Sequence, residues 1–186
     1  PPLGLPKYNY KYLLDEVNLF TNWYFKEINI KLNNDSIKKW ERSWVKIFQK
    51  LDNNKLVLRD FHADNLFWLP NRNNIKKIGL IDFQDALIGN EAYDISSLLE
   101  DVRRDVSKKT KEIAIQEFIQ LNKIKNKKQF IQNYNIFTAQ RNTKIVGIFI
   151  RLARRDKKLH YLELVNKAMK IFLESAKRAK LKEIND

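Results

Sequence analysis

Two segments carry most of the information in this sequence, Leu56-Val-Leu-Arg-Asp-Phe-His-Ala-Asp-Asn65 and Ile78-Gly-Leu-Ile-Asp-Phe-Gln-Asp-Ala86. The first begins with an apolar run that ends at Arg59-Asp60, and Asn65 follows Asp60 by five residues. The second begins with another apolar run, which ends at Asp82. Short apolar runs of this kind are typical of strands. The two segments therefore predict a strand, a loop and a hairpin that bring Asp60, Asn65 and Asp82 together.

These three residues suit the transfer of a phosphoryl group to a hydroxyl. That reaction needs a carboxylate beside the attacking oxygen, to orient it and accept its proton, and oxygen ligands for the Mg²⁺ that bridges the ATP phosphates. The spacing Asp-x-x-x-x-Asn is that of a kinase catalytic loop. We expect Asp60 to be the catalytic residue, and Asn65 and Asp82 to bind Mg²⁺ and, with it, ATP. Either Asp60 or Asn65 alone would be read as a turn residue, so the prediction rests on the combination.

Residues 53–92 predict a catalytic loop and a metal-binding hairpin. Short apolar runs between polar turns predict strands at 56–58, 66–69 and 77–81. The last two are separated by the polar turn 70–74 and should form a hairpin, with Asn65 at the end of one strand and Asp82 at the end of the other. This geometry favours a metal site that both residues share.

Residues 1–52 and 93–186 predict helices. Two apolar stripes at near-helical spacing should be core, the first being Leu14, Val17, Phe20 and Tyr24 and the second, after an Asp35-Ser36 cap signal, Ile37, Trp40, Trp44, Ile47, Phe48 and Leu51. After Gly89 we expect helices near 93–106, 108–122, 128–153 and 159–180. The predicted fold class is α+β and predominantly helical.

Other side chains have two interpretations. The cluster Trp23-Tyr24-Phe25 would edge a sugar site, because aromatic faces suit pyranose rings, but core packing is the preferred interpretation. Glu16 is a weaker sugar-binding candidate. His62 would orient the loop through its ring nitrogens or satisfy a backbone carbonyl, the latter being preferred, and is not expected to be the general base. Four acids would either meet a cationic antibiotic or lie on a solvated helix, which is preferred: Glu91, Glu100, Asp101 and Asp105.

The first segment resembles the catalytic loop of the aminoglycoside phosphotransferase and choline kinase-like superfamily, which typically reads His-Gly-Asp-x-His-x-x-Asn. Leu58 stands where that family commonly has its first His, and the positions that match are Asp60, His62, Asn65 and Asp82. The resemblance implies a protein-kinase-like C-terminal lobe. It also implies that Asp94 braces the catalytic loop, although Asp94 would equally cap the following helix.

Arg59 resembles the Arg of the Arg-Asp pair of protein kinases, and we expect it to support the loop. Gln84 stands where protein kinases have the Gly of Asp-Phe-Gly. A mobile activation segment of that type is therefore not expected.

A closer resemblance is to the bacterial N-acetylmuramate/N-acetylglucosamine anomeric kinases, from about Leu13 to Leu173. It is carried by Leu-Arg-Asp-Phe-His-Ala-Asp-Asn-Leu-Phe-Trp-Leu, Gly-Leu-Ile-Asp-Phe-Gln-Asp-Ala-Leu-Ile-Gly, the run 92–105 and the run 139–153. This resemblance implies ATP-dependent phosphorylation of a sugar at its anomeric hydroxyl, in cell-wall recycling. An aminoglycoside or other small-molecule kinase and a non-catalytic kinase-derived binding module are the alternatives.

The resemblance covers only the second half of such an enzyme. A kinase of this type has an N-terminal lobe with a phosphate-binding Lys and a loop over the phosphates. The four glycines, at 4, 79, 89 and 147, are too scattered to build that loop, and the chain begins Pro1-Pro2. We expect a C-terminal lobe (1–186) whose nucleotide lobe is missing from this sequence, and which is a poor catalyst by itself.

Composition narrows the remaining function classes. A chain of 186 residues with 44% hydrophobic content is ordinary for a globular domain. The net charge of +14 is spread along the chain, and its densest stretch, 151–158, is expected at a helix end, so we do not expect a specific nucleic-acid partner. There is no cysteine, and no apolar run long enough for a bilayer. We therefore expect a cytoplasmic protein with no membrane partner.

Overall fold

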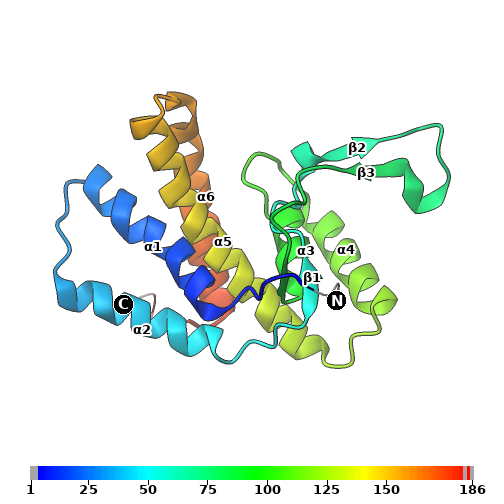
Figure 1. Ribbon diagram of the computed structural model, residues 1–186, viewed down its shortest axis with the longest axis horizontal. Helices are drawn as coiled ribbons and strands as arrows, with labels where there is room; N and C mark the ends of the chain where they lie inside the picture. The colour runs from blue at the N-terminus through cyan, green and yellow to red at the C-terminus, as the bar shows by residue number, and fades with distance from the viewer. Residues whose placement is uncertain (1–3, 182–183, 185–186) are drawn as a thin grey trace.

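A computed structural model of the chain describes residues 4–181 and 184. The described chain is predominantly helical, with two small antiparallel sheets (Figure 1). This confirms the predicted fold class. Residues 182, 183, 185 and 186 of the predicted helical region 93–186 are not among the residues that the structure describes. The helices are α1 Tyr10–Glu27, α2 Asn34–Phe48, α3 Ala92–Leu99, α4 Lys108–Leu121, α5 Lys127–Arg155 and α6 Leu162–Arg178.

Helix α5 is the centre of the helical part. It is 29 residues long, and α1, α3 and α6 pack along it (Figure 1). One apolar cluster surrounds Phe137 and includes residues of α3 and β1, and a second surrounds Phe149 and includes residues of α1 and α6. The two predicted stripes contribute the buried side chains Val17, Phe20, Trp44 and Phe48. Trp23, Tyr24 and Phe25 pack against the second cluster, which confirms the core interpretation.

Gly147 lets α1 and α5 approach closely. A Cβ atom built at this position would overlap the carbonyl carbon and oxygen of Leu19 and lie 2.7 Å from its Cβ. Helix propensity favours Ala over Gly by about 1 kcal/mol, but the backbone of α1 cannot move aside as a flexible side chain can. We expect Gly147→Ala to lower the free energy of unfolding by about 2 kcal/mol, as overpacked cores do. Urea denaturation measures this, with Gly79→Ala as the control, because the Cβ there meets only side-chain atoms, of Leu69 at 3.1 Å and of Phe67 at 3.6 Å.

The predicted hairpin is confirmed. Strands β2 Leu66–Trp68 and β3 Ile78–Leu80 pair antiparallel, with Leu66 opposite Leu80 and Trp68 opposite Ile78. The connection contains a 3₁₀ turn at Asn74–Lys77. Both strands extend away from the helices (Figure 1).

A second sheet supports the start of the predicted catalytic loop. The predicted strand at 56–58 is β1 Lys55–Val57, and it pairs antiparallel with β4 Leu87–Gly89. The sequence did not predict β4, because a run of three residues is too short to show a period. Pro6 and Tyr8 bond to the other edge of β4, where Tyr8 N donates to the carbonyl of Ile88 over 2.8 Å. The buried Val57 therefore starts the loop from a fixed position.

Helix boundaries differ from the prediction at two places. The cap of α2 is Asn33, whose side chain accepts from Ser36 N, so the predicted Asp35-Ser36 cap is wrong by two residues. The predicted helix 93–106 ends at Leu99, because the Asp101 carboxylate bonds to Arg103 N in a turn that competes with the helix. Helix α5 ends at Arg155, inside the basic stretch 151–158, as predicted.

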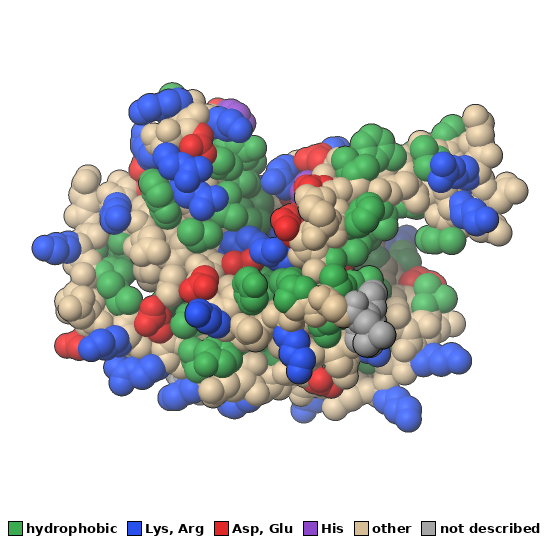
Figure 2. All heavy atoms as spheres, viewed as in Figure 1, with side chains coloured by type: hydrophobic (Ala, Val, Ile, Leu, Met, Phe, Trp, Pro, Cys, Tyr) green, Lys and Arg blue, Asp and Glu red, His purple; other side chains and the backbone are tan. Residues whose placement is uncertain are grey.

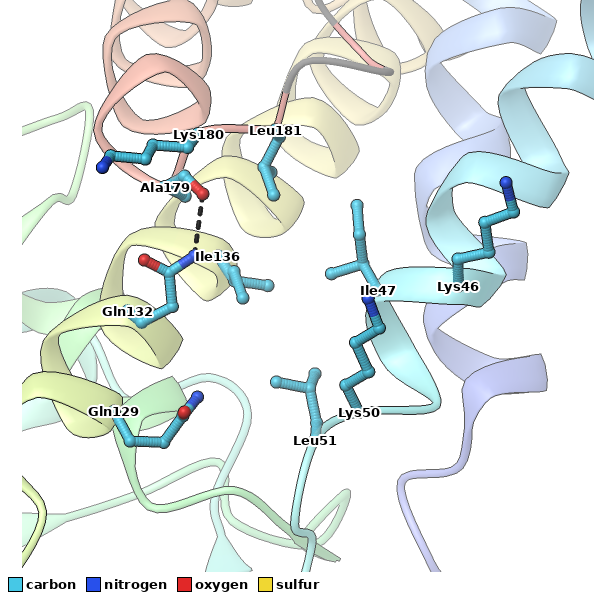
Figure 3. A pocket seen from close by; sticks show the side chains of 10 residues that line it. All are labelled: Lys46, Ile47, Lys50, Leu51, Gln129, Gln132, Ile136, Ala179, Lys180 and Leu181. Carbon is cyan, nitrogen blue, oxygen red and sulfur yellow. Dashed lines mark hydrogen bonds between the residues drawn. The ribbon is translucent and has the colours of Figure 1, made fainter.

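A pocket of about 520 Å³ lies between α2, the first half of α5 and the end of α6 (Figure 3). Ile47, Leu51 and Leu181 line it, and Gln132 bonds to the carbonyl oxygen of Ala179 on its border. None of the predicted site residues lines it. Elsewhere, none of the described helices combines the length and apolar character that crossing a membrane requires.

Candidate active site

The predicted catalytic loop follows β1 directly. Asp60 N donates to the carbonyl of Leu58 over 2.9 Å, and the loop closes with a 3₁₀ turn at Ala63–Asn65, where Asn65 N donates to the carbonyl of His62. The Asp60 side chain is partly exposed. Within the described chain, no side chain forms a hydrogen bond or ion pair with its carboxylate.

Asn65 links Asp60 to Asp82. Its side-chain nitrogen donates to the main-chain oxygen of Asp60 over 2.8 Å and lies 3.4 Å from Asp82 Oδ2. The hairpin register explains this approach, because Ile81 N donates to the carbonyl of Asn65 and Asp82 is the next residue. The structure thus brings together the three residues that the sequence singled out.

The chemistry of Asn65 and Asp82 fits a magnesium ion. The Asn65 amide nitrogen is committed to the Asp60 carbonyl, so the amide oxygen is the atom left for a cation. Asp82 Oδ1 accepts from Gln84 Nε2 over 2.6 Å, which orients the carboxylate. The described residues contain no group of three or more His, Cys, Asp and Glu side chains that would enclose a metal. Mg²⁺ commonly takes one or two protein carboxylates and leaves its other positions to water and phosphate.

Two residues of the site have strained backbones. Arg59 has φ +69° and Asp82 has φ +60°. Non-glycine residues adopt this left-handed region at a cost of about 1–3 kcal/mol each, and such strain gathers at functional sites. Neighbouring contacts must therefore hold both residues in place.

Asp94 braces the loop. Its two carboxylate oxygens accept from Leu58 N at 2.8 Å and Arg59 N at 3.1 Å. Burial raises the pKa of Asp94 to about 6, against the effect of these two hydrogen bonds. Of the two roles that the sequence allowed, the geometry therefore matches bracing of the loop.

His62 faces Asn65 across the loop. Its Nε2 lies 3.4 Å from the Asn65 side-chain nitrogen, and its Nδ1 is buried with no hydrogen-bond partner among the described residues. Burial lowers the pKa of His62, and the nearby Arg103 and Arg141 lower it further. The preferred interpretation, a ring bonded to a backbone carbonyl, has no such bond in the described chain. The ring instead lies against the Asn65 amide.

Glu16 is the centre of a buried polar cluster rather than a sugar contact. Its Oε1 accepts from Arg59 at 2.8 Å and Lys144 at 2.9 Å, and its Oε2 accepts from Gln140 at 2.8 Å and from the Tyr8 hydroxyl. A carboxylate accepts about four hydrogen bonds, so none of this capacity is left for a ligand. The interpretation of Glu16 as a sugar-binding residue is therefore wrong.

The cluster keeps Glu16 ionised. Burial alone would raise the pKa of Glu16, but Lys144, the Tyr8 hydrogen bond and Arg59 together lower it to about 2. Burial would also lower the pKa of Lys144, yet Glu16 raises it above its ordinary value. The sequence missed this cluster, because Tyr8, Glu16, Arg59, Gln140 and Lys144 form no local pattern.

The low pKa of Glu16 predicts a pH dependence of stability. A carboxyl whose pKa is depressed by folding contributes stability above its unfolded value, here 4.5, and loses it as the pH falls toward 2. The expected contribution is roughly 3 kcal/mol. We therefore expect the difference in free energy of unfolding between the wild type and Glu16→Gln to shrink between pH 5 and pH 3 in urea titrations. For Glu27→Gln, which removes an exposed pair with Arg154, the difference should stay small throughout. A constant wild-type minus Glu16→Gln difference would contradict the assignment.

The four acidic residues were predicted to lie on a solvated helix, but two of them are buried near the end of α3. Glu100 and Asp101 are 8% and 1% exposed. Glu100 accepts from Lys111 and from the Tyr134 hydroxyl, and Asp101 pairs with Arg103. These two acids form buried polar contacts in the turn after α3. Asp105 keeps the exposed character that was expected and pairs with Lys167, and Glu91 is partly exposed.

The chain belongs to a family of phosphotransferases. A family model described as the phosphotransferase enzyme family matches residues 13–120, which is more than half of the chain and includes the loop and the hairpin. The match confirms the resemblance that the motifs indicated.

Three relatives of this chain share one name. The N-acetylmuramate/N-acetylglucosamine kinase of Caulobacter vibrioides is 32% identical over 150 residues, which are 80% of this chain and 41% of the relative. The enzyme of that name from Pseudomonas aeruginosa is 28% identical in an alignment of 194 residues that covers 98% of this chain and 55% of the relative. The one from Neisseria meningitidis serogroup B is 31% identical in an alignment of 166 residues that covers 84% of this chain and 48% of the relative. The chain thus spans about half the length of the curated relatives it matches.

Proposed function

We propose that this chain is the catalytic lobe of an ATP-dependent amino-sugar kinase, which phosphorylates the anomeric hydroxyl of N-acetylmuramate or N-acetylglucosamine. The observation that carries the proposal is the convergence of Asp60, Asn65 and Asp82 at one loop and hairpin. The names of the relatives support the choice of sugar. In cells the reaction would serve cell-wall recycling in the cytoplasm.

Each residue has a separate task in this proposal. The Asp60 carboxylate, partly exposed, orients the sugar hydroxyl and accepts its proton as the phosphoryl group arrives. The Asn65 amide oxygen and the Asp82 carboxylate would hold the Mg²⁺ that binds with ATP. When bound, that ion supplies neutralisation of charge on the phosphates. Arg59, His62 and Asp94 keep the loop in shape.

The acceptor would lie in the hollow beside the loop. Figure 2 shows this face hollowed between the ends of α5 and α6 and the hairpin, with charged side chains along its floor. A sugar has many hydroxyls and suits such a polar surface better than an apolar ligand does.

The exposed apolar side chains of the hairpin support the proposal that an N-terminal nucleotide lobe of the same enzyme packs against it. Large apolar side chains on and beside it are 40–64% exposed, an unusual density for a surface that faces water: Phe67, Trp68, Ile78, Leu80, Ile81 and Phe83. They lie beside the proposed metal ligands, where a second lobe would also meet ATP. The greater length of the relatives is consistent with such a lobe.

The test is turnover by the complete enzyme. We would express the whole reading frame that contains this chain and measure magnesium-dependent ADP release with N-acetylmuramate, N-acetylglucosamine and an aminoglycoside. Turnover on an acetamido sugar with a phosphate at its anomeric carbon would support the proposal. Turnover on the aminoglycoside alone would keep the fold and replace the substrate. Nucleotide binding without turnover on any acceptor would favour a binding module.

A further inference from the structure

Arg59 is held from three helices at once. Its main-chain N–H donates to Asp94 of α3 at 3.1 Å, its main-chain oxygen faces Arg141 Nη1 of α5 at 3.5 Å, and its guanidinium donates to Glu16 of α1 at 2.8 Å. Arg59 has a left-handed backbone and is bonded directly to Asp60. A residue in this conformation keeps it only where its surroundings determine it.

The Arg59 guanidinium forms an ion pair with the Glu16 carboxylate. The Glu16 carboxylate is buried, and so is the Lys144 ammonium beside it. Tyr8 contacts both Glu16 and Arg59. Its hydroxyl donates to Glu16, and its ring lies 5.6 Å from the Arg59 guanidinium carbon. With two cations and two neutral donors on one carboxylate, Glu16 has a single geometry available.

This arrangement exceeds what helix packing requires. Burying ions costs desolvation, and apolar residues of similar volume often serve stability as well or better. Gln140 and Lys144 already connect α1 to α5 through Glu16. The bond from Glu16 to Arg59 differs from these two, because it leads out of the helices into the catalytic loop.

We propose that Glu16 is a positioning residue for the phosphoryl transfer: through Arg59 it fixes the loop that presents Asp60, without touching either substrate. This inference rests on the proposed kinase function. The anion that pairs with Arg59 is a carboxylate of the same chain. The fold itself therefore keeps the loop aligned at all times.

The test is Glu16→Gln in the complete enzyme, with Glu27→Gln as the matched control. Both residues lie on α1 and both pair with a cation of α5, but Glu27 pairs with Arg154 at the end of α1 far from the loop. We expect Glu16→Gln to lower kcat by about 10- to 100-fold, the size of effect that a misplaced reacting group produces. The KM for ATP should change by less than about threefold, since Glu16 binds no phosphate. Glu27→Gln should change neither value.

Hydrogen exchange gives a readout that does not depend on activity. The amides of Asp60, His62 and Asn65 bond within the loop, and in Glu16→Gln their protection should fall by a larger factor than that of the α5 amides, which report the global loss of stability. Wild-type kcat and wild-type loop exchange in Glu16→Gln would overturn the proposal. A loss of protection spread evenly over α1, α5 and the loop would also overturn it, because Glu16 would then serve only the packing of the helices.

Glu16→Asp covers the case in which Glu16→Gln does not fold. It keeps the buried negative charge but withdraws the carboxylate by one methylene, so the loop should loosen while the helices stay packed. We expect a smaller fall in kcat and faster loop exchange; wild-type behaviour in both would overturn the proposal. If the wild-type enzyme phosphorylates no sugar, the proposed function fails, and the exchange comparison still decides whether Glu16 positions the loop.

Discussion

Asp60→Asn should lower kcat of the complete enzyme by about 10²–10⁴-fold, the usual contribution of a positioned general base. Asparagine keeps the size of the side chain but cannot accept the proton of the sugar hydroxyl. The loop should survive the change, because Asn65 and His62 bond to the main-chain oxygen of residue 60 and not to its side chain. Affinity for ATP should therefore stay close to that of the wild type. Steady-state ADP release and nucleotide titration measure the two quantities separately.

Asp64→Asn is the control for Asp60→Asn. Asp64 lies in the same loop, but its carboxylate bonds to Arg104 at 2.8 Å, at the surface. Exposed ion pairs contribute little, so kcat should stay within a few-fold of the wild type. Equal losses in the two variants would point to general damage to the loop, and an unchanged rate in Asp60→Asn would remove Asp60 from the chemistry.

Local sequence patterns were enough to predict the parts of the site that depend on neighbours in the chain. The Asp-x-x-x-x-Asn spacing and the strand-turn-strand pattern of 66–81 predicted both the loop and the hairpin. The hairpin register then brings Asn65 next to Asp82, because residues that flank a pair of antiparallel strands lie side by side. Long amphipathic helices such as α5 were predicted within two residues at each end.

Such local patterns could not predict which residues surround the loop. Glu16 lies 43 residues from Arg59 and 128 residues from Lys144 along the chain, and no spacing rule connects them. Glu100 and Asp101 were expected in water because charged residues usually are. The structure buries them because Lys111, Tyr134 and Arg103 supply partners that only the folded chain brings near.

Asp82→Ala should abolish magnesium-dependent turnover of the complete enzyme, a loss on the order of 10³-fold or more. Asp82 supplies the carboxylate of the proposed metal site, and the Asn65 amide alone is a weak ligand for a hard divalent cation. The variant should still fold, because Asp82 is exposed at the end of the hairpin; Ala keeps the left-handed backbone there at a small additional cost in stability. The measurements are ADP release over a range of magnesium concentrations and thermal unfolding of the same samples.

Asp85→Ala is the matched control, because it removes an exposed carboxylate three residues further along the same segment. Its rate and its magnesium dependence should follow those of the wild type. If charge near the hairpin were all that mattered, both variants would lose rate together and high magnesium would rescue both. Turnover by Asp82→Ala at the wild-type rate would end the assignment of this carboxylate to the metal. A selective loss in Asp82→Ala, with unfolding unchanged, would mean that the Asn65–Asp82 approach seen at 3.4 Å is a cation site and not merely the end of a hairpin.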